Sequence, residues 1–179
     1  MTFPAYAPDP QTIADAWTWA KDPKRKMFGS ERESMIGRLG EIMIRHELEL
    51  AGFEVEQGQT YGSDLVLHAK GIRLPVEIKT RASIRRPTLT HDVLVPAKRF
   101  TRQGRESALF MFLWAYENSF DEITVYLLGA EHSSVVAKWP FYDTGDPWPG
   151  SDHRSKYPVY REQVSRLIPL DRLVEALRA

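Results

Sequence analysis

The sequence predicts an α/β domain in which a mixed β-sheet carries helices on its faces. Three observations support this class: an amphipathic segment with helical spacing at 30–51, alternating segments at 53–57 and 64–79, and a near-continuous apolar run at 108–116. Alternating segments are typical of strands with one buried face. A strand that is apolar throughout is typical of the sheet centre, where both faces are covered. Helices packed on such a sheet complete a layered α/β domain.

Length and composition are those of an ordinary soluble globular protein. The chain has 179 residues, of which 42% are hydrophobic and 27% charged, and we expect one domain over 1–179. It has a helical extension at 1–29 and an aromatic, proline-rich loop plus helix at 131–179. The absence of cysteine excludes disulfides, iron–sulfur clusters and thiolate zinc sites. No secretory leader and no uncharged run of bilayer length is present, so we expect a cytoplasmic protein without membrane contact.

Two helices are predicted in the first third of the chain. Residues 11–21 form a short amphipathic helix by their spacing. Ser30 followed by Glu33 is the capping-box signature, which predicts a helix that runs to about Ala51. Gly52 then ends this helix, as a C′ glycine does.

Glu41 is the acid of this second helix that calls for an explanation. It lies three residues before Ile44 and seven before Leu48, and therefore sits on or beside the apolar stripe. A carboxylate in that position needs a partner. Water or Arg45 could supply one, and a functional role is the alternative.

A β-hairpin is predicted around a short turn at 70–71. Residues 72–79 alternate between apolar and polar side chains, so Glu77 and Lys79 must point the same way. Pairing of the two strands could bring Asp64 beside them. Taken alone, an Asp…Glu-x-Lys pattern is more often a cross-strand salt bridge on a solvated face.

Two carboxylates within reach of each other repel unless a cation lies between them. Mg²⁺ prefers oxygen ligands and keeps several waters, so Asp64, Glu77 and the backbone carbonyl of Ile78 would make an open site. Lys79 would orient or help to deprotonate the attacking water. The histidines show no metal-ligand spacing along the sequence. Structural or surface roles are therefore predicted for all of them: His46, His68, His91, His132 and His153.

Two prolines shape the predictions for the rest of the chain. Pro75 cannot donate a ladder hydrogen bond, which predicts a bulge or a strand that begins nearer Val76. Pro96 suits the first turn of a basic helix. The aromatic loop at 139–150 is expected to pack on its own domain rather than to stack on bases. The remaining predicted elements are an extended piece at 92–95, strands at 108–116 and 123–128, a short helix at 132–139, an extended segment at 161–168 and a helix at 170–177.

Charge is distributed unevenly although the net charge is zero. Residues 70–105 contain ten basic and two acidic side chains, whereas residues 117–152 contain seven acidic side chains and one basic. One region of the protein could therefore face phosphates while another avoids them.

With Glu41 on a helix, followed by Asp64 and then Glu77-Ile-Lys79, the sequence resembles the PD-(D/E)XK nuclease superfamily over roughly residues 30–128. The resemblance implies a restriction-endonuclease-like core with the order α-β-β-β-α-β. It matches Glu41 to the helical acid, Asp64 to the acid of the "PD" half, Glu77 to the (D/E) position and Lys79 to the lysine. Within the superfamily, the pattern is most similar to archaeal-type Holliday-junction resolvases and related phage or repair nucleases.

The function that this resemblance implies is a Mg²⁺-dependent DNA endonuclease, with Mn²⁺ as a substitute. Ser63 replaces the nominal proline of the motif. Glu41 would bind the metal or a coordinated water. Most such enzymes cut both strands as dimers, which allows a homodimer here. Phosphate contacts would come from Arg81, Arg85, Arg86, Lys98, Arg99 and Arg102.

Two alternatives remain open at this stage. The first is a catalytically inactive nuclease-like module that binds DNA or protein through the aromatic loop. The second is the same chemistry on RNA. Junction resolution, restriction, repair and phage DNA processing would all use this site, so the sequence does not choose among them.

Overall fold

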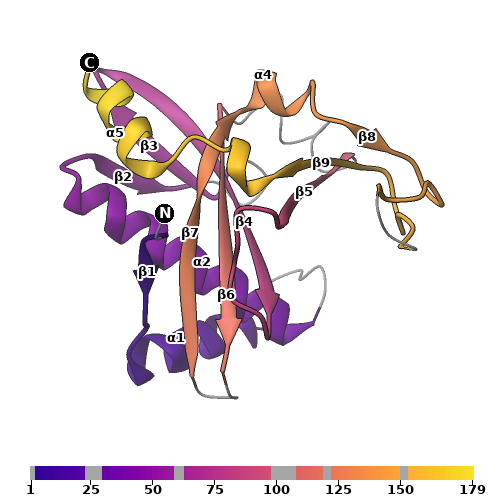
Figure 1. Cartoon of the computed structure of the whole chain (residues 1–179). Coiled ribbons are helices and arrows are strands. Elements are labelled where there is room, and N and C mark those ends of the chain that lie inside the picture. The colour runs from indigo at the N-terminus through magenta and orange to yellow at the C-terminus, as the bar shows by residue number, and fades with distance from the viewer. Residues whose placement is uncertain (1–2, 23–29, 59–62, 98–107, 119–121, 150–152) are drawn as a thin grey trace.

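The protein is built on a six-stranded mixed β-sheet with helices on one face and a three-stranded sheet on the other (Figure 1). The computed structural model describes residues 3–22, 30–58, 63–97, 108–118, 122–149 and 153–179. Strands of the larger sheet are ordered β1-β7-β6-β4-β3-β2, and those of the smaller sheet β5-β9-β8. The predicted mixed sheet flanked by helices is confirmed at this level.

The element boundaries follow the sequence pattern closely. The larger sheet consists of β1 (Ala5–Tyr6), β2 (Glu54–Gln57), β3 (Leu65–Ala69), β4 (Ile72–Ser83), β6 (Leu109–Glu117) and β7 (Ile123–His132). The smaller sheet consists of β5 (Asp92–Pro96), β8 (Phe141–Tyr142) and β9 (Val159–Gln163). The helices are α1 (Pro10–Ala20), α2 (Glu31–Leu50), the single turn α4 (Ser133–Val136), the 3-10 helix η1 (Val164–Arg166) and α5 (Leu170–Arg178).

Helix α2 packs directly on the larger sheet and begins as predicted. The Ser30 side chain accepts from Glu33 N, and the Glu33 carboxylate accepts from Ser30 N. Gly52 takes the left-handed conformation, with φ of 86°, that a C′ residue needs. Gly40 lets α2 approach β4 closely, since a Cβ there would lie 2.1 Å from Thr80 Oγ1.

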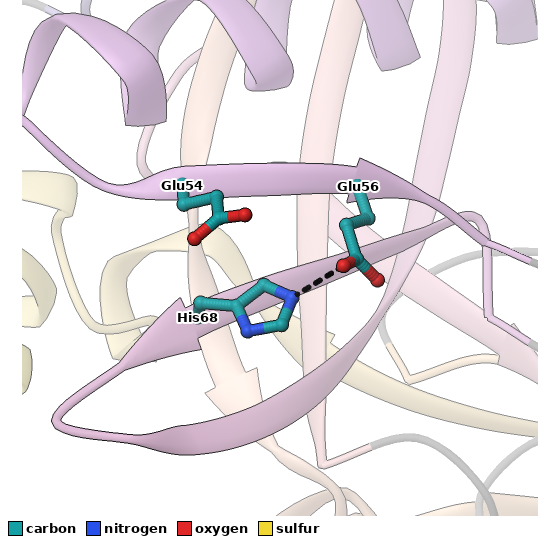
Figure 2. A group of neighbouring side chains, drawn as sticks. All are labelled: Glu54, Glu56 and His68. Atoms are coloured by element: carbon teal, nitrogen blue, oxygen red, sulfur yellow. Dashed lines mark ion pairs between the residues drawn. The ribbon is translucent and has the colours of Figure 1, made fainter.

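Strands β3 and β4 form the predicted hairpin. Lys70 and Gly71 turn with φ of 52° and 73°, a pair of left-handed conformations that matches the twist of the flanking strands. The edge strand β2 pairs with β3 on its other side and places Glu54 opposite His68 (Figure 2).

The expected bulge at Pro75 is wrong, because β4 runs through it in register. Pro75 pairs with Val66 of β3, and its carbonyl accepts from Ala108 N at 2.9 Å. The N and C=O of one strand residue point to the same side, so the missing N–H of Pro75 faces the side of β6. Pairing with β6 begins only at Val76, and the ladder with β3 loses no donor.

Strand β6 lies near the sheet centre and is buried on both faces. One of its faces joins the core under α2, with Met111 and Leu113 at 0% and 1% exposure. The other joins a second core with β5, β9 and η1 through Phe110, Phe112 and Trp114. The near-continuous apolar run in the sequence is thus explained by two cores sharing one strand.

The smaller sheet is the main departure from the predicted single sheet. The extended piece at Asp92–Pro96 pairs with β9 and not with the larger sheet. Trp139, at the start of the aromatic loop, packs on the domain, with 7% exposure and its ring 5.6 Å from that of Phe112, whereas Phe141 of the same loop is 50% exposed. The basic helix predicted after Pro96 falls at 98–107, outside the described residues. Among the residues that are described, no helix is long and apolar enough to cross a membrane.

Candidate active site

The hairpin brings Asp64 to the part of β4 that carries Glu77 and Lys79. Leu65 and Val76 are the last pair of the β3–β4 ladder, and Asp64, the residue before β3, is joined to β4 by its carboxylate, which accepts from Ile78 N. Glu77 follows Val76 along β4 and points to the opposite face of the sheet. Lys79 follows two residues later on the same face. This face points away from α2. The other face of the sheet carries Leu65 and Val76, which pack in the core with α2. The structure therefore brings three of the four predicted catalytic residues together.

Asp64 is held at the point where β3 begins. Its Oδ2 accepts from Ile78 N at 2.7 Å. Its carbonyl accepts from Gly58 N and from Gln57 Nε2, both at 2.9 Å. Since the N–H of Ile78 points towards Asp64, the Ile78 carbonyl faces the same side of β4. That direction fits its predicted part in a metal site.

Glu77 forms an ion pair with Lys79. The side chains are 2% and 15% exposed, respectively. A buried carboxylate is costly unless a cation compensates it, and Lys79 provides that charge. The pair lies within one strand and is largely buried, so it differs from the cross-strand salt bridge on a solvated face that the motif alone favoured.

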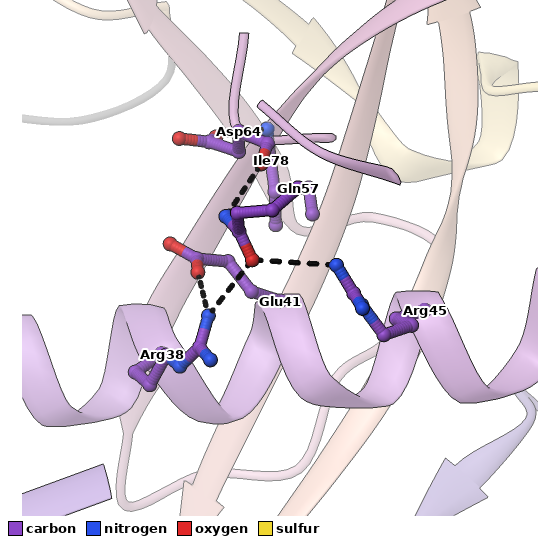
Figure 3. Close-up of polar contacts among 6 residues, drawn as sticks. All are labelled: Arg38, Glu41, Arg45, Gln57, Asp64 and Ile78. Atoms are coloured by element: carbon purple, nitrogen blue, oxygen red, sulfur yellow. Dashed lines mark hydrogen bonds and ion pairs between the residues drawn. The ribbon is translucent and has the colours of Figure 1, made fainter. Parts of the chain in front are cut away.

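Glu41 belongs to a polar network that links α2 to Asp64 (Figure 3). Arg38 Nη1 donates to Glu41 Oε2 at 2.6 Å and lies 3.5 Å from Gln57 Oε1. Arg45 Nη2 donates to the same Gln57 oxygen at 3.3 Å, while Gln57 Nε2 binds the Asp64 carbonyl. Glu41 therefore pairs with Arg38. Arg45, which the sequence offered as a partner of Glu41, contacts Gln57 instead.

Arg38 and Gln57 are two residues of the site that the sequence interpretation missed. Arg38 lies one helical turn before Glu41, a spacing at which opposite charges pair, so this signal was present. Gln57 carries no comparable signal. It reaches Asp64 only because β2 and β3 pair in the observed register.

A basic and aromatic surface continues from Lys79 along β4. Arg81 lies on the same face, with its guanidinium 5.1 Å from the centre of the Trp114 ring. Arg86 lies 5.4 Å from the centre of the Tyr116 ring. Both contacts are in cation–π range, and Arg81, Arg85 and Arg86 are exposed. The other predicted phosphate contacts lie outside the described residues: Lys98, Arg99 and Arg102.

His91 completes this surface by stacking on Trp114, with ring centroids 4.5 Å apart. Burial lowers the pKa of His91 below its usual 6.5, and the positive charge of Arg81 lowers that pKa further. Neutral imidazole is therefore favoured in the folded protein.

No protein-family model matches this chain, and no curated protein sequence matches it. Its function is therefore inferred from its own residues and their geometry.

A second group of potential ligands lies on the same sheet face, nearer its edge. The carboxylates of Glu54 and Glu56 and the imidazole of His68 have ligand atoms within 4.8 Å of one another (Figure 2). The sequence spacing of His68 gave no sign of this group, because the three residues meet across two strands. Glu56 also pairs with Arg73 Nη2 at 2.9 Å. Hydrogen bonding to His68 and then to Arg73 lowers the pKa of Glu56.

A surface pocket of about 550 Å³ lies away from both groups. Its walls come mainly from α5, β7 and the end of α2, and they include Leu127, Leu170 and Val174. None of the predicted catalytic residues lines it, so the candidate chemistry belongs to the sheet face and not to this pocket.

Proposed function

We propose that this protein is a Mg²⁺-dependent DNA endonuclease with a restriction-endonuclease-like core. The observation that carries the proposal is the hydrogen bond from Ile78 N to the Asp64 carboxylate, which holds this acid at the part of β4 that carries Glu77 and Lys79. Glu77 is buried at 2% exposure and forms an ion pair with Lys79. A buried charged pair is costly to desolvate, and electrostatically costly groups cluster at functional sites.

The donor set fits a hard divalent cation. Asp64, Glu77 and the Ile78 carbonyl offer oxygen atoms only, which Mg²⁺ and Mn²⁺ prefer. When bound, Mg²⁺ would offset the two negative charges and polarise a phosphate oxygen. These three residues would hold it. Glu41 lies on α2, on the other side of the sheet, and would act on this site through the network of Arg38 and Gln57 that reaches the Asp64 carbonyl.

Lys79 would act on the attacking water. Its ammonium lies at Glu77 and is 15% exposed, so it combines contact with the acid and access to solvent. From there it orients the water and offsets the charge that develops on the phosphate. Gln57 fixes the Asp64 backbone and thereby positions the Asp64 carboxylate.

Two further features support the proposed core and substrate. Strands β4 and β6 are parallel neighbours, and a parallel pair needs a long crossover connection, usually helical. The described part of that connection contains β5, and the predicted basic helix would lie at 98–107, outside the described residues. Arg81, Arg85 and Arg86 extend a positive surface from Lys79 and would contact phosphates without reading sequence. A structure-specific activity of the resolvase type, and a homodimer that cuts both strands, belong to this same proposal.

The experiment is a cleavage assay with Mg²⁺ on linear duplex, single-stranded, flap and four-way-junction DNA. Asp64→Ala, Glu77→Ala and Lys79→Ala should each abolish cleavage, while circular dichroism and DNA binding persist. Glu131→Gln is the matched control, since Glu131 is a buried acid of β7, 7% exposed, and this variant should cleave normally. Cleavage that survives all three single changes would refute the site. Wild-type protein that binds DNA without cutting it would favour the inactive module, and cleavage restricted to RNA would change the substrate.

A further inference from the structure

We propose that Glu54, Glu56 and His68 form a separate binding site for a transition-metal ion such as Zn²⁺, and that this ion fastens the edge strand β2 to β3. Cross-strand register creates the group. Glu54 pairs directly with His68, and Glu56 lies two residues along β2 on the same face. Figure 2 shows the two carboxylates and the imidazole converging from the two strands.

The imidazole sets this group apart from a cluster of acids. Nitrogen together with carboxylate oxygen is a donor set that suits Zn²⁺ and its neighbours, whereas Mg²⁺ prefers oxygen alone. The Nε2 atom of His68 is buried and lies 3.1 Å from Glu56 Oε1. The nitrogen thus already faces the carboxylate with which it would share an ion.

The distances are compatible with a three-ligand site after small side-chain adjustments. The ligand atoms lie within 4.8 Å of one another, and ligands of a tetrahedral Zn²⁺ lie roughly 3.3 Å apart, given bonds of about 2.0–2.2 Å. Glu54 and Glu56 are exposed, so their long side chains can close that gap. Three protein ligands leave a fourth position for water.

Arg73 competes with the ion for Glu56. Its guanidinium lies 2.9 Å from Glu56 Oε2 and its side chain is 66% exposed, so it can leave the carboxylate and enter solvent. This competition gives the site a distinctive property. Removal of Arg73 should strengthen metal binding, whereas it would only weaken an ordinary ion-pair network.

The site is separate from the proposed nuclease centre on the same face. His68 is four residues from Asp64 along the chain, a span of roughly 13 Å in an extended strand. Two-metal catalytic sites hold their ions about 3.5–4 Å apart. An ion at His68 would therefore act on structure, and β2, which ends at Gln57, is the strand that it would hold in place.

The test is calorimetric titration with Zn²⁺ and absorption spectroscopy with Co²⁺ on the full chain carrying Asp64→Asn and Glu77→Gln, which removes the acids of the proposed nuclease centre. We expect one ion per chain and a higher melting temperature. His68→Asn and Glu54→Gln should each weaken binding at least about tenfold, and Arg73→Gln should tighten it.

His46→Asn is the matched control, because His46 pairs with a single acid, Glu47, at 3.6 Å. It should leave the affinity unchanged. Should the double variant fold poorly, the same titrations are made on wild-type protein in excess Mg²⁺. No Zn²⁺ binding, unchanged affinity in His68→Asn, or weaker binding in Arg73→Gln would each overturn the inference. None of these results would contradict the nuclease proposal. Equally, a failure of the wild-type protein to cleave DNA would not contradict this metal site.

Discussion

The contact between α2 and β4 can be tested by adding one methyl group at Gly40. In Gly40→Ala the new Cβ would lie 2.1 Å from Thr80 Oγ1, 3.3 Å from Thr80 Cβ and 3.5 Å from Thr80 Cγ2. Rotation of Thr80 about χ1 can put its β-hydrogen in place of Oγ1, but it changes a preferred rotamer of a β-branched residue and leaves Thr80 Cβ at 3.3 Å. Either Thr80 changes rotamer at this cost or helix α2 moves away from the sheet, and Glu41, the next residue, then moves with the helix.

The magnitude follows from two opposing terms. Overpacking of a close contact costs about 1–3 kcal/mol, while alanine is preferred over glycine inside a helix by about 0.5–1 kcal/mol. The net effect of Gly40→Ala should be a fall in the free energy of unfolding of up to about 2.5 kcal/mol. Gly37→Ala, one turn earlier with nothing within 4 Å of its added Cβ, should raise it by about 0.5–1 kcal/mol.

Urea denaturation of both variants measures the difference, and a third protein identifies its cause. Thr80→Ala removes the two atoms at 2.1 and 3.5 Å, so Gly40→Ala/Thr80→Ala should recover part of the lost stability, with a coupling of about 0.5–3 kcal/mol. Equal effects of the two glycine substitutions, or no coupling to Thr80, would refute the close approach of α2 to β4.

Three further predictions concern the site and its surroundings. Gln57→Leu removes the hydrogen bond to the Asp64 carbonyl. The kcat for cleavage should therefore fall roughly tenfold, while KM for DNA stays unchanged. An unaltered kcat would show that Gln57 does not position Asp64. Arg81→Ala should weaken DNA binding and reduce the slope of log affinity against log salt concentration by about 0.9. Arg172→Ala is the control, at an exposed ion pair on α5, and should leave this slope unchanged. Equal slopes for the two variants would show that DNA does not contact Arg81. The pKa of His91 is lowered from 6.5 by burial, so the unfolded chain takes up the proton first and stability should decline as pH falls below 6.5. His91→Gln should flatten that decline in denaturation curves between about pH 8 and pH 5, and an identical decline would show that other groups cause it.

Local sequence signals were sufficient for the elements that carry the site. The capping box at Ser30 and Glu33 specified the start of α2 because both partners lie within one turn. The alternation around Glu77 and Lys79 specified their common face because strand side chains have a period of two. A turn of two residues fixes the register of the hairpin, which is why pairing of its strands could bring Asp64 beside them.

Features that depend on distant pairing could not be predicted in this way. Strand β5 pairs with β9, which lies far along the chain. Neither segment carries a sequence signal that identifies the other as its partner. The polar contact of Arg161 with Asp92 at 2.7 Å appears only once that pairing exists. The Glu54, Glu56 and His68 group likewise depends on the register between two strands.

Pro75 shows a different limit of sequence interpretation. Its missing N–H predicts a bulge or a strand that begins nearer Val76, yet the consequence depends on which neighbour that position faces. In the structure it faces the side of β6 just before that pairing begins, so β4 continues. The direction of a backbone group within a sheet follows from the assembled sheet and not from the residue type.

The most direct test of the central claim is Mn²⁺ binding at the two acids, measured by electron paramagnetic resonance. Wild-type protein should bind Mn²⁺ at a site that Mg²⁺ competes for, and Asp64→Asn and Glu77→Gln should each abolish this binding. His68→Asn should retain it, because His68 lies in the other group on the sheet face. Mn²⁺ binding that persists unchanged in both Asp64→Asn and Glu77→Gln would contradict the claim that these carboxylates form a metal site.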